Sequence, residues 1–197
     1  HYSCNRDLKD NIPDSLEYVP MFLVTNIVND REIARIKGFI NEGKVKHVLG
    51  FNEPDLETQA NMSVDEAIAL WPKLEELGVP LGSPVPAETR GPWLEEFIQK
   101  ANENNLRVDF IALHIYQSNN PQLFLDIVDK IYEKYNLPIW ITEMSVVDNE
   151  AETADENRYT SSHFPFNYHK SCGCKCRINS TCGWTSYYKR STYSYRK

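Results

Sequence analysis

Short apolar runs alternate with longer segments of helical period along most of this chain. We expect strands at Tyr18–Val24, His47–Phe51, Val79–Ser83, Val108–His114 and Pro138–Thr142. The last four begin about 30 residues apart, which is the approximate size of one strand followed by its helix. This repetition of βα units favours an α/β fold with a parallel sheet.

The segments between the expected strands carry the features of helix starts. Ser63 and Glu66 form a capping box, in which the hydroxyl accepts from an early backbone N–H and the carboxylate reaches back to the cap. Asn29 or Asp30 is expected to cap an earlier helix, and Pro92 suits the first turn of a later one. A further helix is expected along the apolar stripe of Phe124, Ile127, Val128, Ile131 and Tyr135.

Repeated βα units are typical of a (β/α)8 TIM barrel, which usually needs about 250 residues. This chain has 197 residues. Residues 1–17 are polar and lack a convincing strand, and no apolar segment after Val147 resembles a final strand and helix. We therefore expect a barrel that is incomplete at the N-terminus and lacks its last strand–helix unit.

Bulk composition narrows the class of protein. A hydrophobic content of 41% with 25% charged residues is ordinary for a soluble globular domain. The net charge of −7 argues against a nucleic-acid partner, and no apolar run approaches the roughly 20 residues that span a bilayer. We expect a soluble monomer.

The chain begins at His1 without a visible signal peptide, which indicates a processed form or a fragment and leaves the compartment open.

The C-terminal part differs chemically from the rest. Residues 158–197 carry eight Lys or Arg and no Asp or Glu, and they hold four of the five cysteines, namely Cys172, Cys174, Cys176 and Cys182. Structural zinc pairs usually leave two to four residues between ligands, whereas the first three of these cysteines leave one, so we expect no metal site. A disulfide cluster is an alternative for a secreted chain, but the odd total of five cysteines would leave one thiol over.

These differences predict two regions. Residues 1–162 are interpreted as a partial barrel domain. Residues 163–197 are interpreted as an atypical basic tail rich in Cys, Tyr and Ser. We expect this tail to be a disordered extension, the ending of a truncated gene, or the product of a gene-model or reading-frame error near Ser162.

Two glutamates, Glu53 and Glu143, each follow an apolar segment. Strands of a parallel barrel deliver catalytic groups to one rim at their carboxyl ends, so we expect the two carboxylates to meet there. Retaining cleavage of a glycosidic bond needs such a pair, one acting as acid/base and the other as nucleophile. Either glutamate alone is more simply a loop residue after a strand, whereas for the two together catalysis and a structural role are equal alternatives. Asn52, just before Glu53, is positioned to bond a sugar hydroxyl.

Other polar and aromatic residues have competing interpretations. Trp140 stands three residues before Glu143, so strand alternation places it on the opposite face, under the helices. Trp71 and Trp93 lie on helical stripes and are expected in the core. Tyr116 is either a platform for a glucose ring or an ordinary rim tyrosine.

The loop after Glu53 is expected to bring Gln59 and Asn61 near the cleft. His114 taken alone is more simply a buried structural histidine.

Several motifs occur in the order of one known family, namely Leu49–Asp55, Gln59–Ser63, Leu81–Pro84, Val108–His114 and Trp140–Glu143. On these motifs the chain resembles glycoside hydrolase family 128 of clan A, the domain family of the fungal alkali-sensitive linkage protein. The resemblance extends over roughly residues 18–162.

The resemblance implies a retaining endo-β-1,3-glucanase that works by double displacement without a metal or organic cofactor. Glu53 would be the general acid/base, Glu143 the nucleophile, and Asn52 the neighbour that contacts the sugar. His114 and Tyr116 match a His-aromatic-Tyr motif that lines the cleft. Ile115 departs from the usual tryptophan of this motif and Gln117 from a glycine, which bears on sugar stacking at that rim.

The expected substrate is a β-glucan polysaccharide, and the expected location is therefore outside the cell or at the cell wall. Two alternatives remain open. The first is a glycosidase of the same clan with another β-glucan or mannan specificity. The second is a damaged barrel that binds glucan without cleaving it.

Overall fold

The structure of the chain is a computed structural model. It describes residues 2–3, 17–23, 25–117, 120–146 and 186–188. The strands are β1 Tyr2–Ser3, β2 Val19–Phe22, β3 Val48–Phe51, β4 Leu81–Gly82, β5 Ile111–Gln117, β6 Ile139–Val146 and β7 Ser186–Tyr188. The helices are α1 Asp30–Asn41, α2 Val64–Glu75, α3 Pro92–Glu103 and α4 Pro121–Tyr135, with a short 3-10 turn at Thr25–Ile27.

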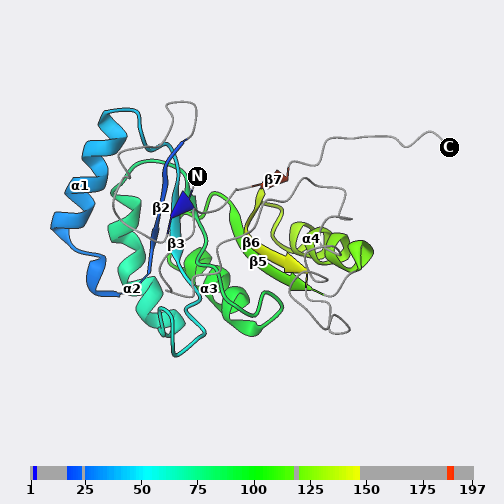
Figure 1. Cartoon of the computed structure of the whole chain (residues 1–197). Coiled ribbons are helices and arrows are strands. Elements are labelled where there is room, and N and C mark those ends of the chain that lie inside the picture. Colours follow the sequence, from blue (N-terminus) through cyan, green and yellow to red (C-terminus); the bar gives the residue numbers. More distant parts are fainter. Residues whose placement is uncertain (1, 4–16, 24, 118–119, 147–185, 189–197) are drawn as a thin grey trace.

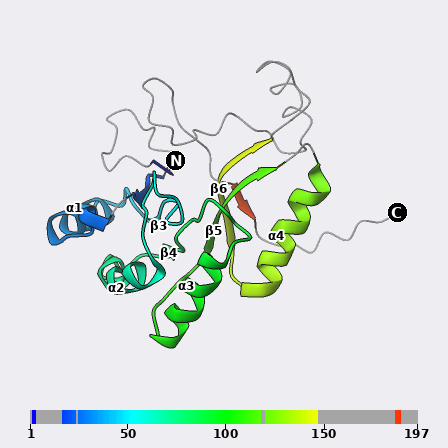
Figure 2. The same ribbon diagram turned by 90° about the horizontal axis from the view of Figure 1, so that it is seen from below.

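Parallel pairing organises the strands. One sheet has the order β1-β2-β3-β4 and the other the order β5-β6-β7, and every pair is parallel except β6 with β7. A parallel bridge between Gly82 and Phe110 connects the β4 edge to the segment leading into β5. The helices α1 to α4 form an arc outside these strands (Figures 1 and 2). The α/β class and the parallel pairing predicted from the sequence are confirmed.

The helix starts follow the predicted caps. Asn29 caps α1 by accepting a hydrogen bond from the backbone N–H of Glu32 at 3.0 Å. Ser63 and Glu66 form the complete capping box at the start of α2. Pro92 occupies the first turn of α3. The two side-chain caps satisfy N–H groups that have no partner inside the helix, and the proline has no N–H to satisfy. Because these features are local, the sequence alone located them.

Each face of the strands has its own apolar layer. On the helix side, α4 packs against β5 and β6 through a cluster that includes Ile111, Ile139 and Val128. On the inner side lies a second cluster, formed by Val19, Met21, Leu49, Val85, Phe110, Ala112 and Trp140. Two buried layers explain why these strands are almost continuously apolar, as parallel strands usually are.

The tryptophans of α2 and α3 lie where the helical stripes placed them. Trp71 is fully buried, and its indole Nε1 donates to the backbone carbonyl of Arg107 at 2.8 Å. Trp93 is partly buried in the same cluster and stacks on Phe97 with the ring centroids 5.6 Å apart. The prediction of a core role is confirmed for Trp71 and, as a partly buried contact, for Trp93.

The prediction for Trp140 is wrong. Its ring stacks on Phe110, with centroids 4.3 Å apart, and therefore belongs to the inner cluster instead of packing under the helices. The cause is a register shift: Leu113 pairs with Ile141 and His114 with Glu143, which leaves Thr142 as an extra residue in β6. A bulge of this kind reverses the alternation of faces beyond it.

Three expectations about strands need correction. β1 lies in the segment that seemed to lack a strand, and β7 lies in the tail where none was expected. Both are too short to show an apolar alternation, and they are recognisable only through pairing with β2 and β6. In addition, β6 continues past Glu143 to Val146, so this glutamate lies inside the strand. Most of residues 163–197, with all four tail cysteines, lie outside the described residues.

Candidate active site

Glu53 follows β3 in a conformation that a non-glycine residue seldom adopts. Asn52 forms an isolated parallel bridge with Val85, and the next residue, Glu53, has a φ of 43°. Its backbone N–H donates to the carbonyl of Val85 at 2.8 Å, and its own carbonyl accepts from Leu56 at 3.1 Å. Left-handed backbone at a non-glycine residue costs of order 1–3 kcal/mol and persists where neighbours enforce it. Hydrogen bonds thus hold both the N–H and the carbonyl of Glu53, and this fixes the direction of the Glu53 side chain.

Gly50 allows the close approach that this arrangement requires. A Cβ at this position would lie 2.8 Å from the backbone nitrogen of Pro84 and 3.0 Å from the Trp71 ring. The segment before Val85 can therefore run directly beside β3 only because residue 50 has no side chain. The glycine of the Leu49–Asp55 motif thus contributes to the placement of Glu53.

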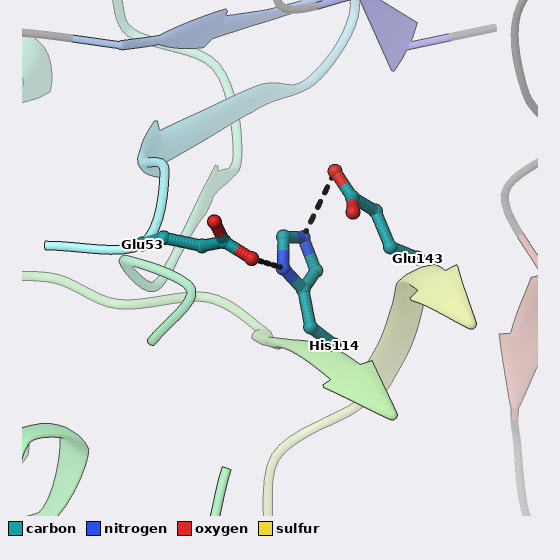
Figure 3. Close-up of side chains that lie close together, drawn as sticks. All are labelled: Glu53, His114 and Glu143. Atoms are coloured by element: carbon teal, nitrogen blue, oxygen red, sulfur yellow. Dashed lines mark hydrogen bonds and ion pairs between the residues drawn. The ribbon is translucent and has the colours of Figure 1, made fainter. Parts of the chain in front are cut away.

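Glu143 and His114 are paired residues of the neighbouring strands β6 and β5. Both are buried, with 2% and 1% of their surface exposed. The His114 ring lies between the two glutamates, with Nδ1 3.0 Å from Glu53 Oε1 and Nε2 3.5 Å from Glu143 Oε1 (Figure 3). Three segments far apart in the sequence thus place two carboxylates on either side of one imidazole.

Tyr116 completes this group from the end of β5. Its hydroxyl donates to Glu143 Oε2. Burial, together with the hydrogen bond to the Glu143 carboxylate, raises the pKa of Tyr116 far above its ordinary value of 10.0. The phenol therefore stays a neutral donor. The residue is also 40% exposed, so part of its ring remains open to solvent.

Asn52 is buried beside the group, but its bonded partner is Gln59. The Asn52 amide Nδ2 donates to Gln59 Oε1 at 3.3 Å, and the backbone N–H of Ala60 donates to the Asn52 carbonyl at 3.2 Å. Among the described residues, Asn52 Oδ1 has no hydrogen-bond partner. The expectation that Gln59 lies near the cleft is supported by this contact, although the sequence did not indicate which residue it holds.

A loop after β4 is fastened to the same region. Asp55 accepts hydrogen bonds from the backbone N–H groups of Ala87 and Glu88 at 2.7 and 3.0 Å. The Thr89 hydroxyl donates to the backbone carbonyl of His114. Sequence reasoning assigned no role to Asp55 or Thr89. The sequence offered one indication for Asp55, namely its place in the Leu49–Asp55 motif. It offered no indication that Thr89 lies near the site.

This loop and the end of β5 enclose a cavity of about 80 Å³ next to Tyr116. Its lining residues are Ala87, Glu88, Thr89, Arg90, His114, Ile115, Tyr116 and Ile127. Ile115 stands where the resemblance expects a tryptophan, and it is buried in the layer under α4. A residue that faces this layer does not present its side chain to the inner side, where the glutamates meet.

The structure brings together four of the sequence-predicted site residues, Glu53, His114, Tyr116 and Glu143, and places Asn52 directly beside them. Parallel βα units that bring together one glutamate after a strand and another within a second strand are typical of the barrel glycoside hydrolases. The family model described as "Glycosyl hydrolase catalytic core" matches residues 1–170. An endo-β-1,3-glucanase of family 128, subgroup I, from Amycolatopsis mediterranei is 32% identical with a TM-score of 0.69, covering 79% of this chain and 68% of that chain. Together with the family match, this relative shows that the chain belongs to glycoside hydrolase family 128.

Solved structures of this family resemble the chain. An endo-β-1,3-glucanase of subgroup I from Amycolatopsis mediterranei, in complex with laminaritriose, is 34% identical with a TM-score of 0.66, covering 77% of this chain and 64% of that chain. A curdlan-specific exo-β-1,3-glucanase of subgroup III from Blastomyces gilchristii, in complex with glucose, is 26% identical with a TM-score of 0.67, covering 82% of this chain and 72% of that one.

A curated relative is Alkali-sensitive linkage protein 1 of Schizosaccharomyces pombe, 34% identical over 120 residues, which are 55% of this chain. The chain spans only 22% of that relative's length, and 64% of the length of the Amycolatopsis structure. Within the described part of the chain, no helix has both the length and the apolar character needed to cross a membrane.

Proposed function

We propose that this chain is a retaining glycoside hydrolase that cleaves β-1,3-glucan within the polymer. The observation that carries the proposal is the meeting of Glu53 and Glu143 on either side of His114, with contacts of 3.0 and 3.5 Å. Retaining enzymes need two carboxyl groups on opposite sides of the scissile bond. Glu53 is the general acid/base and Glu143 the nucleophile.

The reaction has two displacements. In the first, Glu143 attacks the anomeric carbon while protonated Glu53 gives its proton to the glycosidic oxygen, so the C–O bond breaks and a glycosyl-enzyme ester forms. In the second, Glu53 takes a proton from water, the resulting oxygen attacks the same carbon, and the Glu143 carboxylate leaves. Two inversions at one carbon give net retention, and no cofactor is needed.

The surrounding side chains prepare the two carboxylates. The Tyr116 hydroxyl binds Glu143 Oε2 and fixes the orientation of the nucleophile. His114 lies within hydrogen-bond distance of Glu53 and orients the acid/base. The side-chain oxygen Oδ1 of Asn52, which has no hydrogen-bond partner among the described residues, is the atom that we assign to a sugar hydroxyl. His114 and Tyr116 form the wall of the substrate site between the two glutamates.

The substrate class is inferred from the relatives. The Amycolatopsis enzyme binds laminaritriose, a β-1,3-linked oligosaccharide, and the Blastomyces enzyme is curdlan-specific. Polymeric β-1,3-glucan lies outside cells or in cell walls, and we place the protein there as a soluble monomer. We retain the prediction that residues 1–162 form a partial barrel domain and that residues 163–197 are an atypical tail, of which β7 pairs with β6.

Hydrolysis of laminarin with sizing of the products tests the proposal. The wild type is expected to release a ladder of oligosaccharides, and Glu143→Gln is expected to reduce kcat by at least about 10³-fold, because the nucleophile is lost. Glu57→Gln, which changes an exposed glutamate on the same loop as Glu53, is the matched control and should keep full activity. Equal turnover by the wild type and Glu143→Gln contradicts the assignment.

The two roles can be separated with azide. Glu53→Ala with added azide should give a β-glycosyl azide, because the small anion replaces water in the second displacement on an intact glycosyl-enzyme. Glu143→Ala should give the α-anomer, because azide then attacks the substrate directly. The opposite pattern would exchange the roles. Faster cleavage of cellulose or mannan than of laminarin would favour another specificity, and binding of laminarin without turnover would favour a non-catalytic glucan-binding protein.

A further inference from the structure

The Nε2 atom of His114 has no role in the mechanism above. It is fully buried and makes no hydrogen bond among the described residues. The other ring nitrogen, Nδ1, lies 3.0 Å from Glu53 Oε1. An imidazole that donates Nδ1–H to a carboxylate carries its lone pair on Nε2. That lone pair is directed toward the side of the ring where Glu143 lies (Figure 3).

The distance from Nε2 to Glu143 fits two ligands of one zinc ion. Zinc–nitrogen and zinc–oxygen bonds of about 2.0–2.2 Å at a tetrahedral angle place the two donor atoms roughly 3.4 Å apart. His114 Nε2 and Glu143 Oε1 are 3.5 Å apart. One ligand atom from each of Glu53, His114 and Glu143 can be chosen so that all lie within 4.8 Å of one another.

The surroundings of the pair also match a metal site. A histidine that binds zinc through one nitrogen commonly donates its other N–H to a carboxylate, which fixes the ring and raises its basicity. Glu53 stands in that position. The two oxygens of the Glu143 carboxylate have different neighbours. Oε2 accepts from the Tyr116 hydroxyl, and Oε1 is the oxygen that lies near His114 Nε2.

We infer that His114 Nε2 and Glu143 form a zinc site, supported by Glu53, and that zinc and glucan exclude each other there. The ion binds the Glu143 carboxylate, which is the nucleophile in the proposed function. The inhibitory part of this inference rests on that proposed function. Imidazole ligands select zinc over magnesium and calcium, which prefer oxygen donors alone. The site is inhibitory and supplies no chemistry to the reaction.

Thermal unfolding of the full chain with zinc chloride tests binding without reference to activity. Zinc should raise the Tm of the wild type, and magnesium chloride at the same concentration should not. His114→Gln and Glu143→Gln should each lose the response, since each removes one ligand. His47→Gln is the matched control: His47 pairs with Glu17 and is not part of the cluster of Glu53, His114 and Glu143, so its removal should leave the zinc response intact. An undiminished zinc response in both ligand variants, as binding to the tail cysteines would give, overturns the site.

Laminarin kinetics test the exclusion. Zinc should raise KM without changing kcat, KM should double when free zinc equals its dissociation constant, and EDTA should reverse the effect. A fall in kcat at constant KM contradicts a shared site. If the wild type does not turn over laminarin, the proposed function fails, while the difference in Tm response between the wild type and the ligand variants still decides whether zinc binds.

Discussion

Trp140 and Glu143 project from the same face of β6, although they are three positions apart in the sequence. Trp140 pairs with Ala112 and Glu143 pairs with His114, and these two partners are only two positions apart in β5. Thr142 is the extra residue of β6 between these pairs, and its hydroxyl donates to the backbone carbonyl of Leu113 at 3.2 Å. The nucleophile proposed here therefore stands on the same inner layer as the stacked Trp140 and Phe110 rings.

Removal of the Trp140 ring should destabilise the protein strongly. Trp140→Ala is expected to lower the free energy of unfolding by about 3–5 kcal/mol, because it leaves a cavity in the inner cluster next to Phe110 and His47. Trp140→Phe keeps a ring and should lose less. Urea unfolding measures both. A loss for Trp140→Ala below about 0.5 kcal/mol, as surface changes usually give, would contradict the inner position.

Tyr116→Phe should affect catalysis more than stability. It removes the hydroxyl that binds Glu143 and keeps the ring. Hydrogen bonds to charged groups are worth about 1.5–3 kcal/mol, so we expect kcat/KM on laminarin to fall about 10- to 100-fold. Circular dichroism should show unchanged folding. An unaltered kcat/KM would mean that this contact does not orient the nucleophile.

Gln59 should act through Asn52. Gln59→Leu removes the acceptor of the Asn52 amide and is expected to lower kcat/KM about 5- to 10-fold, the usual worth of one neutral hydrogen bond. Gln59→Glu keeps an acceptor at the same position and should recover most of the activity. A double-mutant cycle gives the decisive measurement: in an Asn52→Ala background, Gln59→Leu should have little further effect. Additive losses would show that Gln59 acts independently of Asn52.

The cap of α2 predicts a pH-dependent stability difference. Hydrogen bonds from the Ser63 backbone N–H and hydroxyl lower the pKa of Glu66 below its ordinary value of 4.5. The stabilisation is therefore present above pH 4.5 and is lost as the pH falls through the lower, folded-state pKa. Ser63→Ala should lower Tm by about 2–4 °C at pH 7.

This Tm difference should narrow at acidic pH, and Ser63→Thr, which keeps the hydroxyl, should behave like the wild type. Differential scanning calorimetry between pH 3 and 7 measures it. A difference that stays constant over this range would mean that the bond from the Ser63 hydroxyl to the Glu66 carboxylate contributes nothing.

Much of the fold was predictable because it depends on local interactions. The caps at Asn29 and Ser63 and the proline at the start of α3 lie where the sequence placed them. Residue 115 shows where the family pattern was less informative. Ile115 replaces an expected tryptophan, yet its side chain packs under α4, and this placement depends on pairing with β6.

The sequence by itself determined the order of the βα units, the starts of the helices and the candidate residues, because periodicity and capping are encoded within a few neighbouring positions. Only the tertiary structure decided that His114 bridges the two glutamates, that Asn52 is held by Gln59, and that Trp140 faces inward. These relationships depend on strand register and on one extra residue in β6. Register is set by pairing between distant segments, which local sequence patterns do not specify.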